Sequence, residues 1–203
     1  MAKILHLPVK QPSKFGFKRA SKRKKDPEQL GQLNLFSSRK GRILHLPSRF
    51  TLFEEALLLD ERDDPKAAEL YREAIAADDC VADAYCNLGI LESRAGSTDK
   101  AFDCFTKSLK QDPRHLEAHY NLGNLYFEME NLRLAQQHYE MAAEIDSSFP
   151  NIYFNLGLVQ AIIEDFNAAV TALSKYKELV STEEADKADE LLNSLKRSLA
   201  VQH

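Results

Sequence analysis

Residues 82–115 read ADAYCNLGILESRAGSTDKAFDCFTKSLKQDPRH, residues 116–149 read LEAHYNLGNLYFEMENLRLAQQHYEMAAEIDSSF, and residues 150–183 read PNIYFNLGLVQAIIEDFNAAVTALSKYKELVSTE. The three blocks are equal in length, align without a gap and follow one another directly. Each block carries Asn-Leu-Gly, then an alanine, and four residues later a large apolar residue. These positions are Asn87, Asn121 and Asn155, then Ala101, Ala135 and Ala169, then Phe105, Tyr139 and Leu173.

Each block predicts two amphipathic helices joined by a short turn. Apolar residues lie three and four positions apart in each half, which is the period of a helix face. The turns fall at Gly96-Ser97, Glu130-Asn131 and Glu164-Asp165. A glycine inside a first helix costs about 1 kcal/mol relative to alanine. Such glycines are explained if two helices approach closely there, and we expect the large residues to fill the space between successive pairs.

The 34-residue period, the small Gly and Ala positions, the following aromatic and the Asp112-Pro113 terminator resemble the tetratricopeptide repeat (TPR) family. The resemblance implies an all-α fold, a right-handed α-solenoid of helix-turn-helix repeats. It also implies that the first helices line a concave surface.

The flanking sequence predicts the ends of the array. A degenerate repeat is expected over 48–81, because PKAAELYREAIAADD matches the second helix whereas Phe53 and Glu55 replace Asn and Gly. The regular repeats occupy 82–115, 116–149 and 150–183, and residues 184–203 predict a capping helix. Terminal repeats are commonly atypical because one face has no neighbour.

Residues 1–47 predict a disordered basic tail. Residues 1–50 carry 13 Lys/Arg and two acidic residues, a balance of +11, whereas the remainder carries 14 basic and 29 acidic residues, a balance of −15. Ile-Leu-His-Leu-Pro occurs at 4–8 and again at 43–47, which is either chance or a pair of extended docking peptides. The basic cluster KRASKRKK at 18–25 resembles a nuclear-import signal, and its alternatives are phosphate contacts or simple solubility.

A short motif in the tail offers a different function. Gln32, Leu33, Leu35 and Phe36, in QLNLF, resemble the linear motif by which bacterial proteins dock on the sliding clamp of the replication machinery. Because a five-residue match has many false positives, this reading is the alternative rather than the main one.

The sequence contains no phosphate loop, nucleophile elbow or HExxH motif, so we predict that the protein is not an enzyme and needs no cofactor. His115, His119 and His138 lack a completing ligand set, so no metal site is expected. Three cysteines without a CxxC pair, no 20-residue apolar run and no signal-peptide core favour the cytoplasm, or the nucleus if the source is a eukaryote.

The predicted binding surface follows from mapping the repeats onto the resemblance. Its residues recur on the first helices and are Asn87, Asn121, Asn155, Tyr120, Asn124, Phe127, Phe154 and Leu158. A primary amide can pair with both polar groups of a peptide unit. The spaced asparagines therefore resemble the asparagine ladder in the repeat arm of the O-linked N-acetylglucosamine transferases. The alternative is that each asparagine bonds within its repeat or to a neighbouring helix.

The composition of this surface predicts its ligand. Lys and Arg are nearly absent, with Arg94 the exception, which argues against gripping a C-terminal carboxylate. We therefore predict an adaptor or scaffold for an extended, apolar peptide. The acidic charge of the repeat region favours a peptide that also carries basic residues. The protein's own tail is a candidate ligand, in cis or from a second copy. The alternative function is a nucleic-acid-associated or replication-linked factor, with nucleic acid the less favoured partner and no membrane partner.

Overall fold

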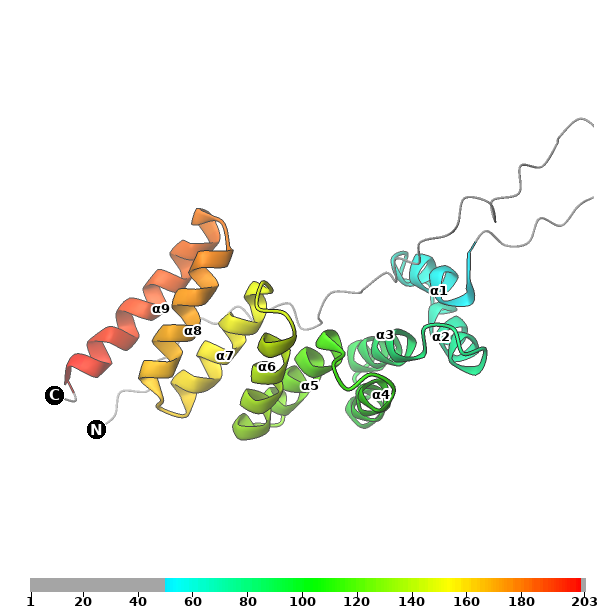
Figure 1. Ribbon diagram of the computed structural model, residues 1–203, viewed down its shortest axis with the longest axis horizontal. Coiled ribbons are helices and arrows are strands. Elements are labelled where there is room, and N and C mark those ends of the chain that lie inside the picture. Colours follow the sequence, from blue (N-terminus) through cyan, green and yellow to red (C-terminus); the bar gives the residue numbers. More distant parts are fainter. Residues whose placement is uncertain (1–49, 202–203) are drawn as a thin grey trace, which may run out of the picture.

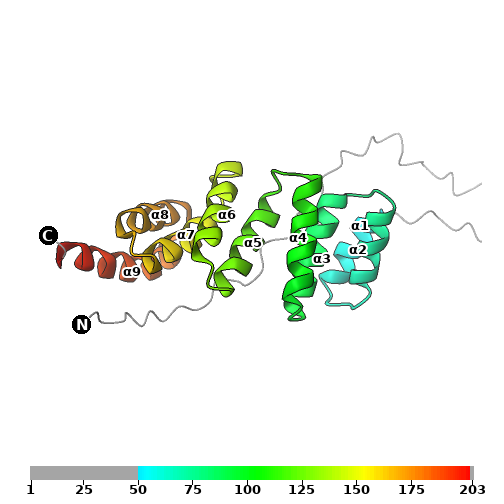
Figure 2. The same cartoon turned by 90° about the horizontal axis from the view of Figure 1, so that it is seen from below.

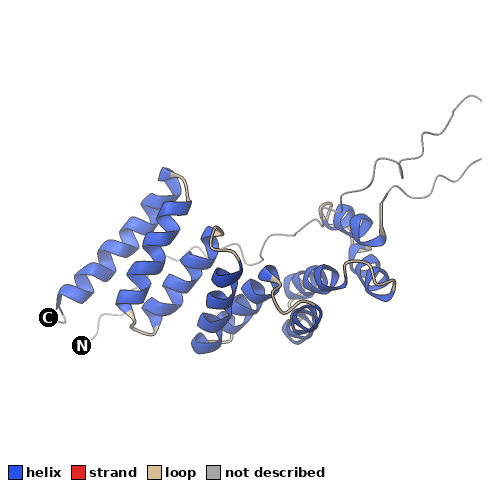
Figure 3. Ribbon diagram, in the orientation of Figure 1, coloured by secondary structure: helices blue, strands red, loops and turns tan. Residues whose placement is uncertain are grey.

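The computed structural model describes residues 50–201, which form nine α-helices and no strand (Figures 1 and 3). The helices are α1 (Leu52–Asp60), α2 (Ala67–Ala76), α3 (Val81–Arg94), α4 (Thr98–Gln111), α5 (Leu116–Glu128), α6 (Leu132–Ile145), α7 (Pro150–Ile162), α8 (Phe166–Leu179) and α9 (Thr182–Val201). The predicted all-α class is confirmed. The tail at 1–47 lies outside the described residues. None of the described helices is long and apolar enough to span a membrane.

The helices form an elongated array in which each packs on the next. Pairs α1–α2, α3–α4, α5–α6 and α7–α8 are the repeats, and α2–α3, α4–α5, α6–α7 and α8–α9 join them. First helices α3 and α5 also touch directly. Figures 1 and 2 show the array running from α1 at one end to α9 at the other. This arrangement is the α-solenoid that the repeat period predicts.

Glycines on the first helices allow close packing inside each repeat. A Cβ atom added to Gly89 would lie 2.7 Å from Cε1 of Phe105, and one added to Gly123 would lie 2.5 Å from Cε1 of Tyr139. Because real Cβ atoms do not approach so closely, only glycine fits. The large residue of the second helix thus packs on the glycine of its own repeat. It also packs against the next repeat, because Phe105 shares a cluster with Leu122 of α5 and Tyr139 shares one with Leu156 of α7.

The turns inside the three regular repeats use the same left-handed backbone. Gly96, Glu130 and Glu164 occupy the same repeat position and have φ of 77°, 59° and 66°. The next residue caps the second helix in two of them, because Asn131 Oδ1 accepts from Leu134 N at 3.3 Å and Asp165 Oδ1 accepts from Ala168 N at 3.1 Å. The turn geometry is therefore a property of the repeat and is not limited to glycine.

The degenerate first repeat is fixed by polar contacts at its ends. Thr51 and Glu54 form a capping box at the start of α1, and Asp79, from the loop before α3, accepts from Phe53 N at 3.0 Å. At the other end the Tyr71 hydroxyl donates to Asp60 at 3.1 Å. Phe53 is fully buried against Tyr71, which explains why the helix tolerates Phe where the regular repeats carry Asn.

Helix α9 closes the far end of the array. Leu191, Leu192 and Leu195 join the apolar cluster that contains Leu158 and Leu173. Tyr176, at a position that is small in most repeats, packs its ring 5.1 Å from that of Phe154. Lys177 forms an ion pair with Asp189 between α8 and α9. The helix thus covers the last repeat as a cap, beginning at Thr182 rather than at the expected residue 184.

Candidate functional site

The residues predicted for the binding surface lie on α3, α5 and α7, and most of them are buried. Asn87, Asn121 and Asn155 are 3, 2 and 3 % exposed, and Tyr120 and Leu158 are also buried. Asn124, Phe127 and Phe154 are half-buried. The three half-buried residues are therefore the accessible part of the predicted surface.

Asn155 connects α7 to the preceding repeat. Its Nδ2 group donates to Oη of Tyr120 at 3.2 Å and to Oδ1 of Asn124 at 3.0 Å, with Oη of Tyr139 at 3.4 Å. The Tyr139 hydroxyl in turn donates to Asn124 Oδ1 at 2.8 Å. Burial raises the pKa of Tyr120 to about 12, and burial also raises that of Tyr139, so both hydroxyls stay protonated.

Two of the asparagines interact with the tyrosine at the large position of the preceding repeat. Asn155 does so with Tyr139, and Asn87 lies beside the Tyr71 hydroxyl. Burial and the nearby Asp60 raise the pKa of Tyr71, and the Asn87 amide only partly offsets this rise. The matching residue for Asn121 is Phe105, which offers no hydroxyl, and Asn121 Nδ2 lies 4.0 Å from Cys86 Sγ instead. These contacts agree with the second of the two expectations for the asparagines, in which each one bonds to a neighbouring helix.

Two amide atoms are not fully used by these contacts. Asn87 Nδ2 and Asn155 Oδ1 are buried and make no hydrogen bond of good geometry among the described residues. A buried polar atom without a partner costs about 1–3 kcal/mol. A role of the asparagines in holding a peptide stays a prediction.

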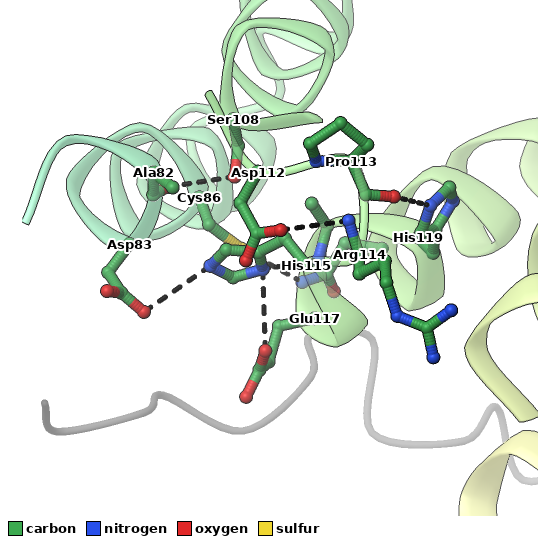
Figure 4. Close-up of polar contacts among 12 residues, drawn as sticks. Ala82, Asp83, Cys86, Ser108, Asp112, Pro113, Arg114, His115, Glu117 and His119 are labelled. Atoms are coloured by element: carbon green, nitrogen blue, oxygen red, sulfur yellow. Dashed lines mark hydrogen bonds and ion pairs between the residues drawn. The ribbon is translucent and has the colours of Figure 1, made fainter. Parts of the chain in front are cut away.

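The sequence missed a group of charged residues where α3 and α5 begin. Asp83 Oδ1 lies 3.4 Å from Nε2 of His115, and Glu117 Oε2 lies 3.4 Å from Nδ1 of the same ring (Figure 4). We call these three residues the acidic site. Figure 4 shows both carboxylates on the side of His115 away from Ser108 of α4. The available signal was that Asp83 and Glu117 occupy the same position, the second, in consecutive repeats.

His115 also caps α5. Its Nδ1 accepts from Ala118 N at 3.2 Å, so in this role the proton is on Nε2, toward Asp83. The Nδ1 lone pair then faces a Glu117 carboxylate oxygen. One nitrogen cannot accept from Ala118 and donate to Glu117 at once, so Nδ1 caps α5 while the Glu117 carboxylate lies beside it.

His119 and His138 form a pair within the second regular repeat. Their Nδ1 atoms are 3.0 Å apart, and His119 Nε2 lies 3.1 Å from the Pro113 carbonyl oxygen. His119 therefore carries its proton on Nε2 and accepts at Nδ1 from His138. Burial lowers the pKa of both rings, that of His138 to about 4. Among the described residues no group of three or more His, Cys, Asp or Glu is arranged to hold a metal.

Arg94, the basic exception on this face, already has acidic neighbours. Its Nη1 lies 3.4 Å from Oδ1 of Asp60, whose side chain is buried, and 4.0 Å from Oδ1 of Asp63. Asp60 and Arg94 occupy the same position in consecutive repeats, so the pair links one repeat to the next. The guanidinium is thus engaged within the array.

Comparison with known proteins agrees with this architecture. The fold and the recurring first-helix residues define an α-solenoid of helical hairpins with a 34-residue repeat. Family models described as "Tetratricopeptide repeat" match residues 82–115 and 116–149, the same two blocks that the alignment defines. These two blocks, residues 82–149, match the tetratricopeptide repeat, as the sequence pattern predicts.

The relatives are similar over part of their length or in fold alone. Protein bimA of Emericella nidulans is 32 % identical over 88 residues, which is 43 % of this chain and 11 % of bimA. The first TPR of Spaghetti (RPAP3), bound to HSP90 peptide SRMEEVD, is 22 % identical with a TM-score of 0.54, covering 59 % of this chain and 93 % of its own. A MamA structure from AMB-1 is 19 % identical with a TM-score of 0.62, covering 73 % and 81 %.

Proposed function

We propose that this protein is a protein-interaction adaptor that holds an extended peptide along α3, α5 and α7. The tetratricopeptide fold supports a scaffold, and the Spaghetti neighbour binds a peptide on a similar fold. The main observation is the set of half-buried residues Asn124, Phe127 and Phe154 on consecutive first helices. They combine apolar surface with an amide that can bond to a peptide backbone.

The charge of the array supports a ligand unlike the acidic SRMEEVD peptide of that neighbour. Residues 51–203 carry a balance of −15. The one arginine on the face is held by Asp60 and Asp63, so it is poorly placed to bind a carboxylate. We propose an apolar ligand with basic residues, because the net negative charge of the array favours a cationic partner.

The test is retention of arrayed 12-residue peptides of varied composition by the full chain. Apolar, basic peptides should be retained most strongly, and Phe127→Lys should reduce their binding at least tenfold. The matched control is Met141→Lys on α6, which is 44 % exposed and should bind as wild type. Equal binding by both variants, or preference for acidic peptides, would contradict the proposal.

The replication-linked alternative rests on Gln32, Leu33, Leu35 and Phe36, and the nucleic-acid alternative on the basic tail, all outside the described residues. Neither gains an observation from the array, and both stay predictions, as does a cytoplasmic location. Salt-dependent retention on DNA or RNA that is lost with residues 1–47 would favour the nucleic-acid reading.

A further inference from the structure

We propose that the edge of the array at the α5–α6 and α7–α8 turns binds residues 4–8, Ile-Leu-His-Leu-Pro, of the same chain. We call this surface the turn edge. It consists of the exposed residues Met129, Ile162 and Ile163, with the half-buried Leu132 and Phe166 beside them. It contains none of the residues on which the proposed function rests, so the inference goes beyond that function and is tested separately.

The turn edge is an exposed apolar patch. Met129, Ile162 and Ile163 are 59, 51 and 41 % exposed, and they are three of the five large apolar side chains that are exposed in the described part of the chain. Met129 and Ile163 are the C-caps of α5 and α7, and Figure 1 shows the two turns on the same side of the array, the lower one in that view. Contiguous exposed apolar patches mark interaction surfaces, whereas single exposed apolar residues are ordinary.

The first two repeats show that the turn does not require apolar residues at these positions. Their residues are Glu61 and Ala95 where the later repeats have Met129 and Ile163, and Asp64 and Thr98 where the later repeats have Leu132 and Phe166. Glu61 and Ala95 are helix C-caps, just as Met129 is. The apolar character of the turn edge in two neighbouring repeats therefore has a cause other than the turn itself.

The charge around the turn edge favours a basic partner. Residues 127–133 and 161–167 carry four acidic residues and one basic residue, a balance of −3. Glu130 and Glu164 are exposed at the left-handed turn position where the preceding repeat has Gly96, so the backbone there does not call for an acidic side chain. The same edge of a second copy would bring like charges together, which opposes self-association through this surface.

The N-terminal segment supplies a peptide of matching chemistry. Residues 3–10 read KILHLPVK, with a lysine at each end and no acidic residue. Met129 and Ile163 are one repeat apart, roughly 10–20 Å at ordinary helix packing distances. Five extended residues cover about 16 Å. One Ile-Leu-His-Leu-Pro phrase can therefore contact both repeats of the turn edge.

The position of each phrase in the sequence decides which copy can bind. Ile-Leu-His-Leu-Pro occurs at 4–8 and at 43–47. The turn edge lies two and three repeats beyond α1, roughly 20–60 Å away at ordinary packing distances. The chain from Pro8 to Phe50 reaches about 140 Å when extended, and the chain from Pro47 to Phe50 only about 10 Å. The first phrase can therefore reach the turn edge in cis, whereas the second cannot.

Methyl NMR on the full chain tests the proposal, with the methyl groups of the exposed turn edge residues as probes. The test variant carries Ile4→Ser, Leu5→Ser and Leu7→Ser, and the matched control carries Ile43→Ser, Leu44→Ser and Leu46→Ser. The test variant should move the probe signals at least fivefold further than the methyl signal of Met141, which is 44 % exposed on α6. The control should leave the probe signals in place. Unmoved probe signals in the test variant would overturn the proposal.

Concentration separates docking in cis from docking of a second copy. The probe signals of the wild-type chain should stay constant over a tenfold range of chain concentration, because an intramolecular contact does not depend on it. Signals that move with concentration, or an equal response to the two phrase variants, would assign the contact to a second copy and overturn docking in cis.

Variants of the turn edge test the other side of the contact. Met129→Gln with Ile163→Gln should move the backbone amide signals of residues 4–8 to the positions that they have in a synthetic peptide of residues 1–12. Met141→Gln is the control and should leave them at their wild-type positions. Both test substitutions are at exposed side chains, and if they disturb folding the phrase variants still decide. Wild-type amide signals that already match the free peptide would contradict docking.

The adaptor and the docked phrase can fail separately. If the phrase variants leave the turn edge signals unmoved while Phe127→Lys still removes peptide binding, the adaptor stands and docking of residues 4–8 is wrong. If the turn edge responds as expected while Phe127→Lys binds peptides as wild type does, docking stands and the adaptor is wrong.

Discussion

Gly123 shows how one residue sets the distance between two helices. A Cβ atom there would lie 2.5 Å from Cε1 of the Tyr139 ring, which is itself buried and hydrogen-bonded to Asn124. Gly123→Ala should therefore lower the free energy of unfolding by about 1–3 kcal/mol through overpacking. Urea unfolding measures this, with exposed Gln137→Ala as the control near zero. A neutral Gly123→Ala would show that the Tyr139 ring moves freely.

Asn155 and Tyr139 are predicted to couple across a repeat boundary. Asn155→Ala and Tyr139→Phe both remove parts of one hydrogen-bond network, so their effects should not add. A double-mutant cycle in urea should give a coupling energy of about 0.5–1.5 kcal/mol. The cycle of Asn155→Ala with Tyr85→Phe, in another repeat, should be additive. Additivity of the first cycle would mean that the network does not contribute to stability.

The turn between α5 and α6 carries avoidable backbone strain. Glu130 has φ of 59°, a region that disfavours side chains, whereas Gly96 occupies the same repeat position with φ of 77°. Glu130→Gly should raise stability by roughly 0.5–1 kcal/mol, and Gly96→Ala should lower it by about 1 kcal/mol. Thermal unfolding measures both. Gln137→Gly, inside α6, should instead destabilise by about 1 kcal/mol, which separates the turn effect from glycine itself.

The contact between α5 and α6 should weaken in acid. Burial holds the pKa of His138 at about 4, below its ordinary value of 6.5, and lowers that of His119. The unfolded chain therefore binds more protons between these values, so the contribution is complete above pH 6.5 and is lost as the pH falls toward 4. After discounting for partial exposure, we expect a loss of about 1–2 kcal/mol for His138.

Urea unfolding at pH 7.0, 5.5 and 4.5 tests this dependence. His138→Phe keeps a ring against Tyr126, which stacks 5.4 Å from His138, but removes the titrating group. The variant should lose less stability than wild type over this range. Identical pH profiles for the two proteins would contradict the assignment.

At the scale of the whole molecule, the array should unfold from an end that has lost its cap. Leu192 is 4 % exposed and packs in the cluster that holds Leu158 and Leu173. Leu192→Asp should speed hydrogen exchange in α7–α9 at least tenfold and leave α3–α4 within twofold, because each repeat contacts only its neighbours. Exposed Asn193→Asp is the control. Equal acceleration along the whole chain would show a single cooperative unit.

The elements could be read from the sequence because their signals are local. The repeat period, the helical spacing of apolar residues and the turn positions predict every helix pair and the terminal cap. Boundaries shifted only slightly, as where α9 begins at Thr182. Helical periodicity within one segment decides which residues face inward.

The candidate site was predicted less completely. The sequence placed Asn87, Asn121 and Asn155 on one face but could not show that two of them interact with a tyrosine of the preceding repeat. It treated His115 with His119, whereas the structure joins His119 to His138 and His115 to Asp83 and Glu117.

The sequence by itself therefore determined the helices, their pairing and their repetition, since these follow from patterns within a single repeat. Tertiary structure alone decided which side chains meet across repeats and how deeply they are buried. Those contacts depend on the angle and distance between stacked helices, which no local pattern encodes. For the same reason the acidic site at the start of α3 and α5 emerges only when two repeats are placed side by side.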